Sequence, residues 1–269
     1  MTNFPALDDV DDRSLGQIRN HLTEHDPGKV LGLYLYGSTV ADERGPDSDL
    51  DLLLITRDSL SQTERRELTN LLLELSGWGG HADIHPEAVG RRPIELTSFA
   101  TGGERTVAPY EGHDFQYGEW LRTELLIGAR PQPQKDRDAP ILLATAQYNH
   151  QRLAGAELDS LIATVPDEIL RHAMSSVIPT LLDEVDGDER NVLLTLARIA
   201  VTTDSGRFVS KGRAAELTAA RLTSTSAATL LLARTESLGE VHVDWAARHE
   251  AVLQTIGELV ELTPSSSAP

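Results

Sequence analysis

Two aspartates at the start of an apolar run constrain this chain more than any other feature. The segment 33–54, LYLYGSTVADERGPDSDLDLLL, holds one apolar run that ends at Gly37-Ser38 and a second that opens with Asp49 and Asp51. Alternate residues of a strand point to the same side, so both carboxylates are expected to project together, about 7 Å apart. Such a pair at the edge of a core needs a cation to stay ionised. The pattern therefore indicates a metal site, and Mg²⁺ bridging nucleotide phosphates is its usual form.

A third carboxylate is expected from a later strand. Glu95 lies inside the predicted strand 91–99, with Ile94 and Leu96 facing the other way. A glutamate in that position is costly unless it meets a metal or a proton to be moved. Asp83 is the alternative, in a predicted loop. Glu95 is therefore the first choice both as a metal ligand and as a base.

The Gly37-Ser38 step after the first strand is suited to a phosphate. Glycine permits close approach of the backbone to a ligand, and the Ser38 hydroxyl and amide can hold a phosphate oxygen. A Gly-Ser pair alone usually marks only a turn. Its combination with the paired aspartates favours a nucleotide site.

Hydrophobic periodicity predicts an α/β (α+β) first domain with a mixed sheet, followed by an all-α helical bundle. The boundary is expected at Val165-Pro166, giving domains at 1–164 and 165–269, with a disordered tail at 263–269. Strands are predicted at 29–36, 50–56 and 91–99. Helices are predicted at 11–25, 64–76, 115–130, 139–163, 167–185, 188–204, 210–222, 225–237 and 242–262.

Composition narrows the function classes. The chain has no cysteine, which excludes disulfides, thiolate catalysis and cysteine-ligated zinc. A net charge of −18 argues against a protein that wraps nucleic acid and suits a cationic small molecule. No apolar run is long enough to span a membrane, and the N-terminus lacks the pattern of a secretion signal. We expect a cytoplasmic monomer with no membrane partner.

These residues together resemble the nucleotidyltransferase superfamily of the polymerase-β type. The carriers are Gly37-Ser38, the run Ser48-Asp49-Leu50-Asp51-Leu52, and Glu95. A narrower resemblance, over about residues 30–240, is to the streptomycin/spectinomycin adenylyltransferases of the aminoglycoside adenylyltransferase family. It rests on FQYGEWLRTELLIGARPQP (115–133), APILL (139–143) and, most specifically, GDERNVLLTLARI (187–199).

The resemblance implies an ATP- and Mg²⁺-dependent enzyme that places AMP on a hydroxyl of an aminocyclitol antibiotic, and so a role in antibiotic resistance. Asp49 and Asp51 would bind two Mg²⁺ ions with Glu95, and Glu95 would be the catalytic base. The expected ATP contacts are Gly37, Ser38, Ser48, Asp138, Arg198 and Lys211. It also implies that Asp188, with Asn191 nearby, contacts the cationic part of the drug. Apart from the resemblance, an ammonium-bearing drug needs carboxylate partners, and Glu119 could supply a further one.

The sequence departs from the family at three positions. Members that accept streptomycin have a tryptophan and then an aspartate where this chain has Pro179 and Glu184. Without that aromatic surface, we expect spectinomycin, at its 9-hydroxyl, to be the substrate and streptomycin to be a poor one. A family tyrosine that contacts the nucleotide aligns with Ser237, which leaves nucleotide selectivity open.

Two alternatives remain at this point. The chain could nucleotidylate another small metabolite or a macromolecular acceptor, although its acidic charge disfavours tRNA. It could also be a non-catalytic nucleotide-binding or drug-binding module, against which the presence of Asp49, Asp51 and Glu95 argues.

Overall fold

The computed structural model describes residues 9–41, 43, 45, 48–103 and 112–263. The chain divides into two compact units. The first comprises Met1–Asp42, Asp47–Ala139 and Asn149–Thr164, and the second comprises Glu43–Pro46, Pro140–Tyr148 and Val165–Pro269. The units therefore change at Thr164, but two short segments from earlier in the chain group with the second unit. The predicted tail at 263–269 lies outside the described residues except for Thr263.

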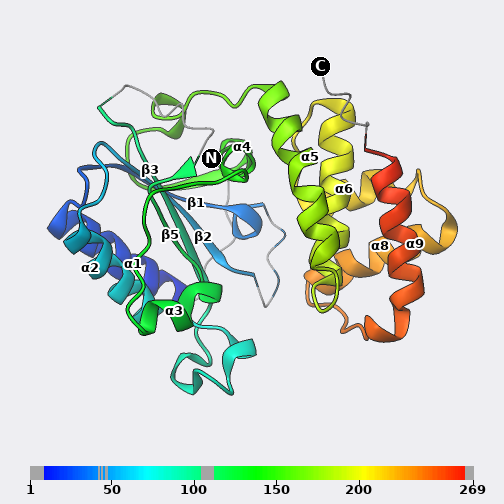
Figure 1. The fold of residues 1–269 in the computed structure, drawn as a ribbon, viewed down its shortest axis with the longest axis horizontal. Helices are drawn as coiled ribbons and strands as arrows, with labels where there is room; N and C mark the ends of the chain where they lie inside the picture. The colour runs from blue at the N-terminus through cyan, green and yellow to red at the C-terminus, as the bar shows by residue number, and fades with distance from the viewer. Residues whose placement is uncertain (1–8, 42, 44, 46–47, 104–111, 264–269) are drawn as a thin grey trace. The chain divides into compact units, whose positions relative to one another are not determined.

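The first unit is built on a five-stranded mixed sheet with the order β5-β3-β2-β1-β7 (Figure 1). Its central strands β2 and β3 run parallel, and all other neighbours are antiparallel. The strands are β1 (Val30–Tyr36), β2 (Leu50–Thr56), β3 (Ile94–Ala100), β5 (Phe115–Tyr117) and β7 (His150–Gly155). A separate two-stranded sheet pairs β4 (Gly112–His113) with β6 (Gln134–Lys135).

Two helices cover one face of this sheet (Figure 1). They are α1 (Asp9–His25) and α2 (Gln62–Leu75), and α2 makes the crossover that parallel strands require. A capping box starts α2: the Ser61 hydroxyl accepts from the Glu64 N–H, and the Glu64 carboxylate accepts from the Ser61 N–H. The core beneath them includes Leu15, Ile18, Leu22, Leu33, Leu35, Leu50, Leu52, Leu54, Leu68, Leu72, Ile94 and Leu96.

The prediction of one helix over 115–130 was wrong. The segment begins with strand β5 and continues through a 3-10 turn, η4 (Glu119–Leu121), into the short helix α3 (Arg122–Leu126). Phe115 and Tyr117 are buried on either side of a half-buried Gln116, which is the alternation of a strand. Three residues are too few for that period to stand out against the helical spacing that follows.

The prediction of one long helix over 139–163 was also wrong. Helix α4 (Ala139–Tyr148) ends early, and β7 and the 3-10 turn η5 (Leu158–Ser160) follow it. Gly155 has a φ of +83°, a left-handed conformation that a right-handed helix cannot contain. Pairing with β1 at the sheet edge therefore decided the structure of this segment.

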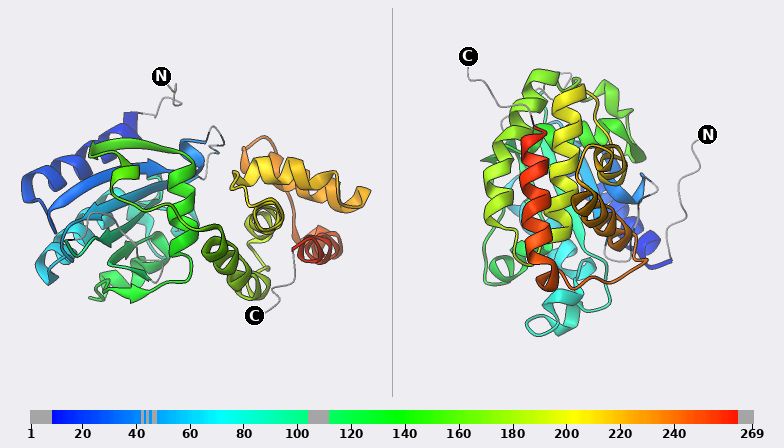
Figure 2. Two further views of the ribbon diagram at one scale, coloured as in Figure 1. Left: turned by 90° about the horizontal axis from the view of Figure 1, so that it is seen from above. Right: turned by 90° about the vertical axis from the view of Figure 1, so that its right-hand side faces the viewer.

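Helices dominate the second unit, which Figure 2 shows from two further directions. Besides α4, most of which groups with this unit, five helices follow one another along the chain: α5 (Asp167–Asp183), α6 (Glu189–Ser205), α7 (Lys211–Ala219), α8 (Ser224–Ser237) and α9 (His249–Glu261). Helix α6 packs against α5, α7, α8 and α9, so it is apolar on most of its circumference. The helix predicted over 242–262 starts only at His249, after a 3-10 turn, η6 (Ala246–Arg248).

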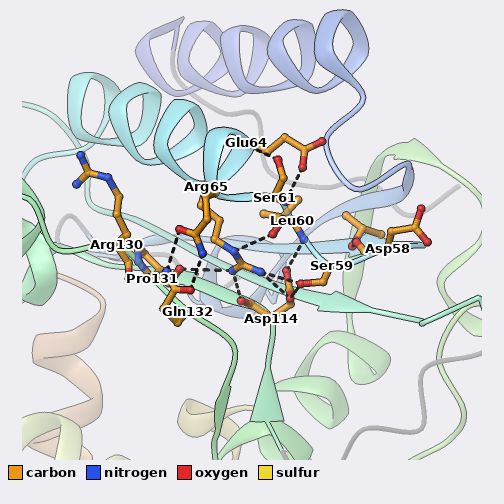
Figure 3. Close-up of polar contacts among 12 residues, drawn as sticks. Asp58, Ser59, Leu60, Ser61, Glu64, Arg65, Asp114, Arg130, Pro131 and Gln132 are labelled. Atoms are coloured by element: carbon orange, nitrogen blue, oxygen red, sulfur yellow. Dashed lines mark hydrogen bonds and ion pairs between the residues drawn. The ribbon is translucent and has the colours of Figure 1, made fainter.

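A buried ion pair ties the loop after β2 to the start of β5 (Figure 3). Arg65, on α2, donates from Nη2 to Oδ1 of Asp114 over 2.8 Å, and both side chains are almost fully buried. The same guanidinium donates to the carbonyl of Leu60 and to the hydroxyl of Ser59. Each group therefore has the partners that a buried charge requires.

In the part of the chain that the structure describes, every helix is too short or too polar to cross a lipid bilayer.

Candidate active site

Three carboxylates meet where β2 and β3 begin. One oxygen from each of Asp49, Asp51 and Glu95 lies within 4.8 Å of the others. The parallel register pairs Asp51 directly with Glu95, and Asp49 lies two residues before Asp51 on the same side. All three side chains are half-buried. The juxtaposition predicted from strand alternation is thus present.

The chain makes room for this cluster at the end of β1. Tyr36 pairs with Asp51 across the sheet, and the next residue, Gly37, has a φ of +77°. A Cβ at Gly37 would lie 2.0 Å from Oδ2 of Asp51, so only glycine fits there. Two residues on, the Thr39 hydroxyl donates to the carbonyl of Asp49 over 3.2 Å. The 3-10 turn η1 (Gly37–Thr39) therefore lies against both aspartates.

The cluster suits a hard divalent cation. Three carboxylates at this separation repel one another unless positive charge is supplied. Carboxylate oxygens are the ligands that Mg²⁺ prefers, with water and substrate phosphates completing its shell. The donor set therefore fits Mg²⁺.

The other predicted ATP contacts of the first unit occupy two places. Ser38 lies in η1, and Ser48 immediately precedes Asp49, so both border the carboxylate cluster along the chain. Asp138 is exposed just before α4, and its N–H donates to Oδ1 of Asp136 over 2.8 Å. The two serines thus adjoin the cluster along the chain, and Asp138 belongs to a separate segment.

In the second unit, the predicted residues form one polar chain at the start of α6 and α7. Asn191 donates to Oδ2 of Asp188 over 2.9 Å, and Lys211 Nζ donates to Oδ1 of Asn191 over 2.5 Å. Asp188 is the N-cap residue of α6 and is exposed. An acid, an amide and a cation that the sequence predicted separately are thus joined.

Arg198 has an aromatic partner that the sequence interpretation missed. Its guanidinium carbon lies 5.3 Å from the centre of the Phe208 ring, a cation–π distance. The Phe208 ring also lies near a second aromatic residue, Tyr148, with the two ring centres 5.7 Å apart. The position of Phe208 three residues before Lys211 was the available signal.

Glu119 has a different role from the predicted one. It is 6% exposed, and its carboxylate accepts from Ser76, Tyr117 and Arg122, the last over 2.7 Å to Nε. Burial acts to raise the pKa of Glu119, but the hydrogen bonds from Arg122 and Ser76 and the Arg122 charge outweigh it and lower that pKa. The carboxylate thus serves the interior of the first unit through these three partners.

Comparison with known proteins identifies the family. A family model for the C-terminal domain of aminoglycoside adenylyltransferase matches residues 160–261, and a polymerase beta nucleotidyltransferase model matches residues 17–84. A spectinomycin 9-adenylyltransferase from Campylobacter jejuni is 36% identical over 221 residues, which are 81% of this chain and 82% of the relative. This chain belongs to the aminoglycoside adenylyltransferase family. It is therefore an enzyme of the nucleotidyltransferase class, as its motifs predicted.

Two further relatives support the family assignment and the fold. An aminoglycoside (3'') (9) adenylyltransferase from Escherichia coli is 32% identical over 239 residues, covering 87% of this chain and 86% of the relative. The crystal structure of spectinomycin adenyltransferase AAD(9) from Enterococcus faecalis, with ATP and spectinomycin, superposes with a TM-score of 0.80. It is 25% identical and covers 93% of this chain and 99% of its own. The predicted mixed-sheet domain followed by a helical region is thus confirmed.

Proposed function

We propose that this family member transfers AMP from ATP to a hydroxyl of an aminocyclitol antibiotic, and that its substrate is spectinomycin, modified at the 9-hydroxyl. The observation that carries the proposal is the meeting of Asp49, Asp51 and Glu95 within 4.8 Å, in a chain whose relatives include proteins named spectinomycin 9-adenylyltransferase. The AAD(9) structure, which contains ATP and spectinomycin, supports the same pair of substrates.

Asp49, Asp51 and Glu95 would hold two Mg²⁺ ions. When bound, these ions would supply positive charge to the triphosphate and to the pyrophosphate as it leaves. On the protein side, Gly37 and Ser38 would hold phosphate oxygens through the backbone and the hydroxyl, with Ser48 next to the metal ligands.

The transfer is a displacement at the α-phosphorus of ATP. The oxygen of the antibiotic hydroxyl forms a bond to that phosphorus, and the bond from the phosphorus to the oxygen bridging to the β-phosphate breaks. Pyrophosphate leaves with the bonding electron pair, in line with the attack. The hydroxyl proton passes to the Glu95 carboxylate, which acts as general base.

The remaining contacts come from polar and charged side chains. Arg198 and Lys211 are proposed to contact ATP phosphates, because their cations match that charge. Asp138 is proposed as a further ATP contact. Asp188 would bind the cationic part of the drug, with Asn191 beside it, since the two are already hydrogen-bonded.

One incubation tests this function. The protein, ATP, Mg²⁺ and spectinomycin should yield pyrophosphate and an adduct heavier than the drug by one AMP, located at the 9-hydroxyl by NMR. The wild type should bind ATP in a Mg²⁺-dependent way, and the Asp49→Asn variant should lose that binding. A module that binds only the drug would show no such binding in either protein. Absence of both products with spectinomycin, in the presence of pyrophosphate release with another acceptor, would refute the substrate assignment.

We also propose that the enzyme acts as a monomer in the cytoplasm, where ATP is available. Light scattering during gel filtration should give the mass of one chain, 29.3 kDa.

A further inference from the structure

We propose that Arg92 and Asp11 are positioning residues for the carboxylate cluster. Neither was singled out by sequence, and they lie 81 positions apart. This inference rests on the proposed function, because it concerns the metal site that the function requires.

Arg92 links the two segments that carry the acids. Its Nη1 donates to the carbonyl of Ser48 over 2.7 Å, and Ser48 immediately precedes Asp49. Arg92 is itself three residues before Glu95 on the chain that enters β3. A single guanidinium therefore fixes the approach to β2 against the approach to β3.

A backbone hydrogen bond next to this contact keeps the same alignment. The N–H of Leu50 donates to the carbonyl of Pro93 over 2.9 Å, at the point where the parallel pairing begins. On the far side of Asp49, Thr39 donates to the Asp49 carbonyl. The backbone around Asp49 is thus held from both sides. Among these three hydrogen bonds, only the one from Arg92 has a charged donor.

Asp11 orients Arg92. Nε of Arg92 donates to both carboxylate oxygens of Asp11, over 3.2 Å to Oδ1 and 3.0 Å to Oδ2. The Asp11 side chain is 3% exposed and that of Arg92 is 17% exposed, so water competes little for either. Asp11 lies in the first turn of α1, where the helix dipole also favours its charge.

In metal sites, residues that do not touch the metal often hold its ligands in position, and Arg92 and Asp11 are placed to do so here. Groups that fix the ligand-bearing backbone limit how far the ligand oxygens move, and losing such support commonly weakens metal binding 10–100-fold. The Arg92 contact requires two N–H directions at once, one toward Ser48 and one toward Asp11, which the single ammonium of lysine does not reproduce. Loss of either Arg92 or Asp11 should therefore weaken the alignment of the cluster, although all three of its acidic residues are still present.

The first unit contains a matched control for the general cost of breaking a buried ion pair. Arg65 and Asp114 form a pair of the same residue types and similar burial, also between a helix and a strand approach (Figure 3). Arg65 donates to Ser59, Leu60, Asp114 and Pro131. Within the described part of the chain, none of these partners lies in the segments that carry the three acids.

The test compares Asp11→Asn, Arg92→Lys and Asp114→Asn in the full chain. Binding of Mn²⁺, a paramagnetic stand-in for Mg²⁺, is measured by electron paramagnetic resonance, and urea unfolding is followed by circular dichroism. We expect all three variants to unfold at lower urea. Only Asp11→Asn and Arg92→Lys should weaken Mn²⁺ binding, by about 10–100-fold.

The outcomes separate the two proposals. Unchanged Mn²⁺ affinity in both Asp11→Asn and Arg92→Lys, or an equal loss in Asp114→Asn, overturns the positioning role while AMP transfer by the wild type upholds the function. A wild type that binds Mn²⁺ but forms no AMP adduct refutes the function instead. If Asp11→Asn does not fold, Arg92→Lys, which keeps the charge, decides the positioning role.

Discussion

Gly37 and Asp51 are complementary in shape: the missing side chain of one provides the space for the carboxylate of the other. A Cβ at Gly37 would lie 2.0 Å from Oδ2 of Asp51 and 3.3 Å from its Cβ. The backbone of Gly37 is also left-handed, with a φ of +77°. The glycine that the sequence suggested for approach to a ligand therefore also makes room for a carboxylate of the proposed metal site.

Gly37→Ala should greatly reduce AMP transfer. The new methyl group would push the Asp51 carboxylate away from Asp49 and Glu95, and a misplacement of about 1 Å can cost on the order of 100-fold in rate. The left-handed backbone adds a stability loss of about 1–2 kcal/mol. Initial rates of pyrophosphate release and urea unfolding measure the two effects.

Gly102→Ala is the control for Gly37→Ala. Gly102 is also left-handed, with a φ of +64°, but a Cβ there would meet no atom within 4 Å. It should lose similar stability and keep its rate. An equal loss of rate in both variants would mean that backbone strain, and not displacement of Asp51, explains the effect.

Glu95→Gln should lower kcat by about 100- to 10,000-fold, because the amide cannot accept the hydroxyl proton. Glutamine retains one oxygen that can contact a metal, so ATP binding should fall much less. Single-turnover rates and calorimetric titration with ATP and Mg²⁺ separate the two quantities. A kcat near that of the wild type would rule out Glu95 as the base.

Much of this site could be predicted because its geometry follows from short-range rules. Alternation along a strand placed Asp49 and Asp51 on one side, and the apolar neighbours Ile94 and Leu96 placed Glu95 on the polar side of its own strand. The predicted strand at 50–56 has the bounds observed for β2. Local pattern and tertiary pairing agree here, so the sequence was sufficient.

Features that depend on distant partners could not be predicted. The contact of Arg92 with Asp11 spans 81 residues and leaves no periodic trace. Strand β7 forms because its residues complete the edge beside β1, which local helical spacing does not reveal. Glu119 differs, because Arg122 stands three residues later, and that spacing could have indicated an ion pair instead of a drug contact.

Glu119 should contribute to stability in a pH-dependent way. Its pKa is lowered below the ordinary 4.5 in the folded protein, so its contribution is complete above about pH 4.5 and is lost as the pH falls through the lowered value. Glu119→Gln should therefore destabilise the protein at pH 7, by on the order of 3 kcal/mol, because Arg122 stays buried without its counter-charge. The difference from wild type should shrink as the pH approaches 3.

Glu87→Gln provides the matched comparison. Glu87 faces the same guanidinium, with Oε1 4.0 Å from Nη1 of Arg122, but its side chain is 57% exposed. Exposed pairs contribute about 1 kcal/mol or less, so this variant should unfold nearly as the wild type does at every pH. Urea midpoints between pH 3 and 7 give both curves, and a pH-independent cost for Glu119→Gln would contradict the lowered pKa.

Streptomycin should be adenylylated far more slowly than spectinomycin. Pro179 lies inside α5 on an exposed turn, and Glu184 follows as the C-cap residue, so neither position offers an aromatic face for the drug. Proline inside a helix also removes one backbone N–H, so Pro179→Trp is not expected to weaken α5.

The double variant Pro179→Trp, Glu184→Asp should gain streptomycin turnover at least tenfold, about 1.4 kcal/mol in the transition state, with little change for spectinomycin. Competition between the two drugs in one reaction, read by mass spectrometry of both adducts, gives the ratio directly. A wild-type ratio near one would show that Pro179 and Glu184 do not decide the choice of acceptor.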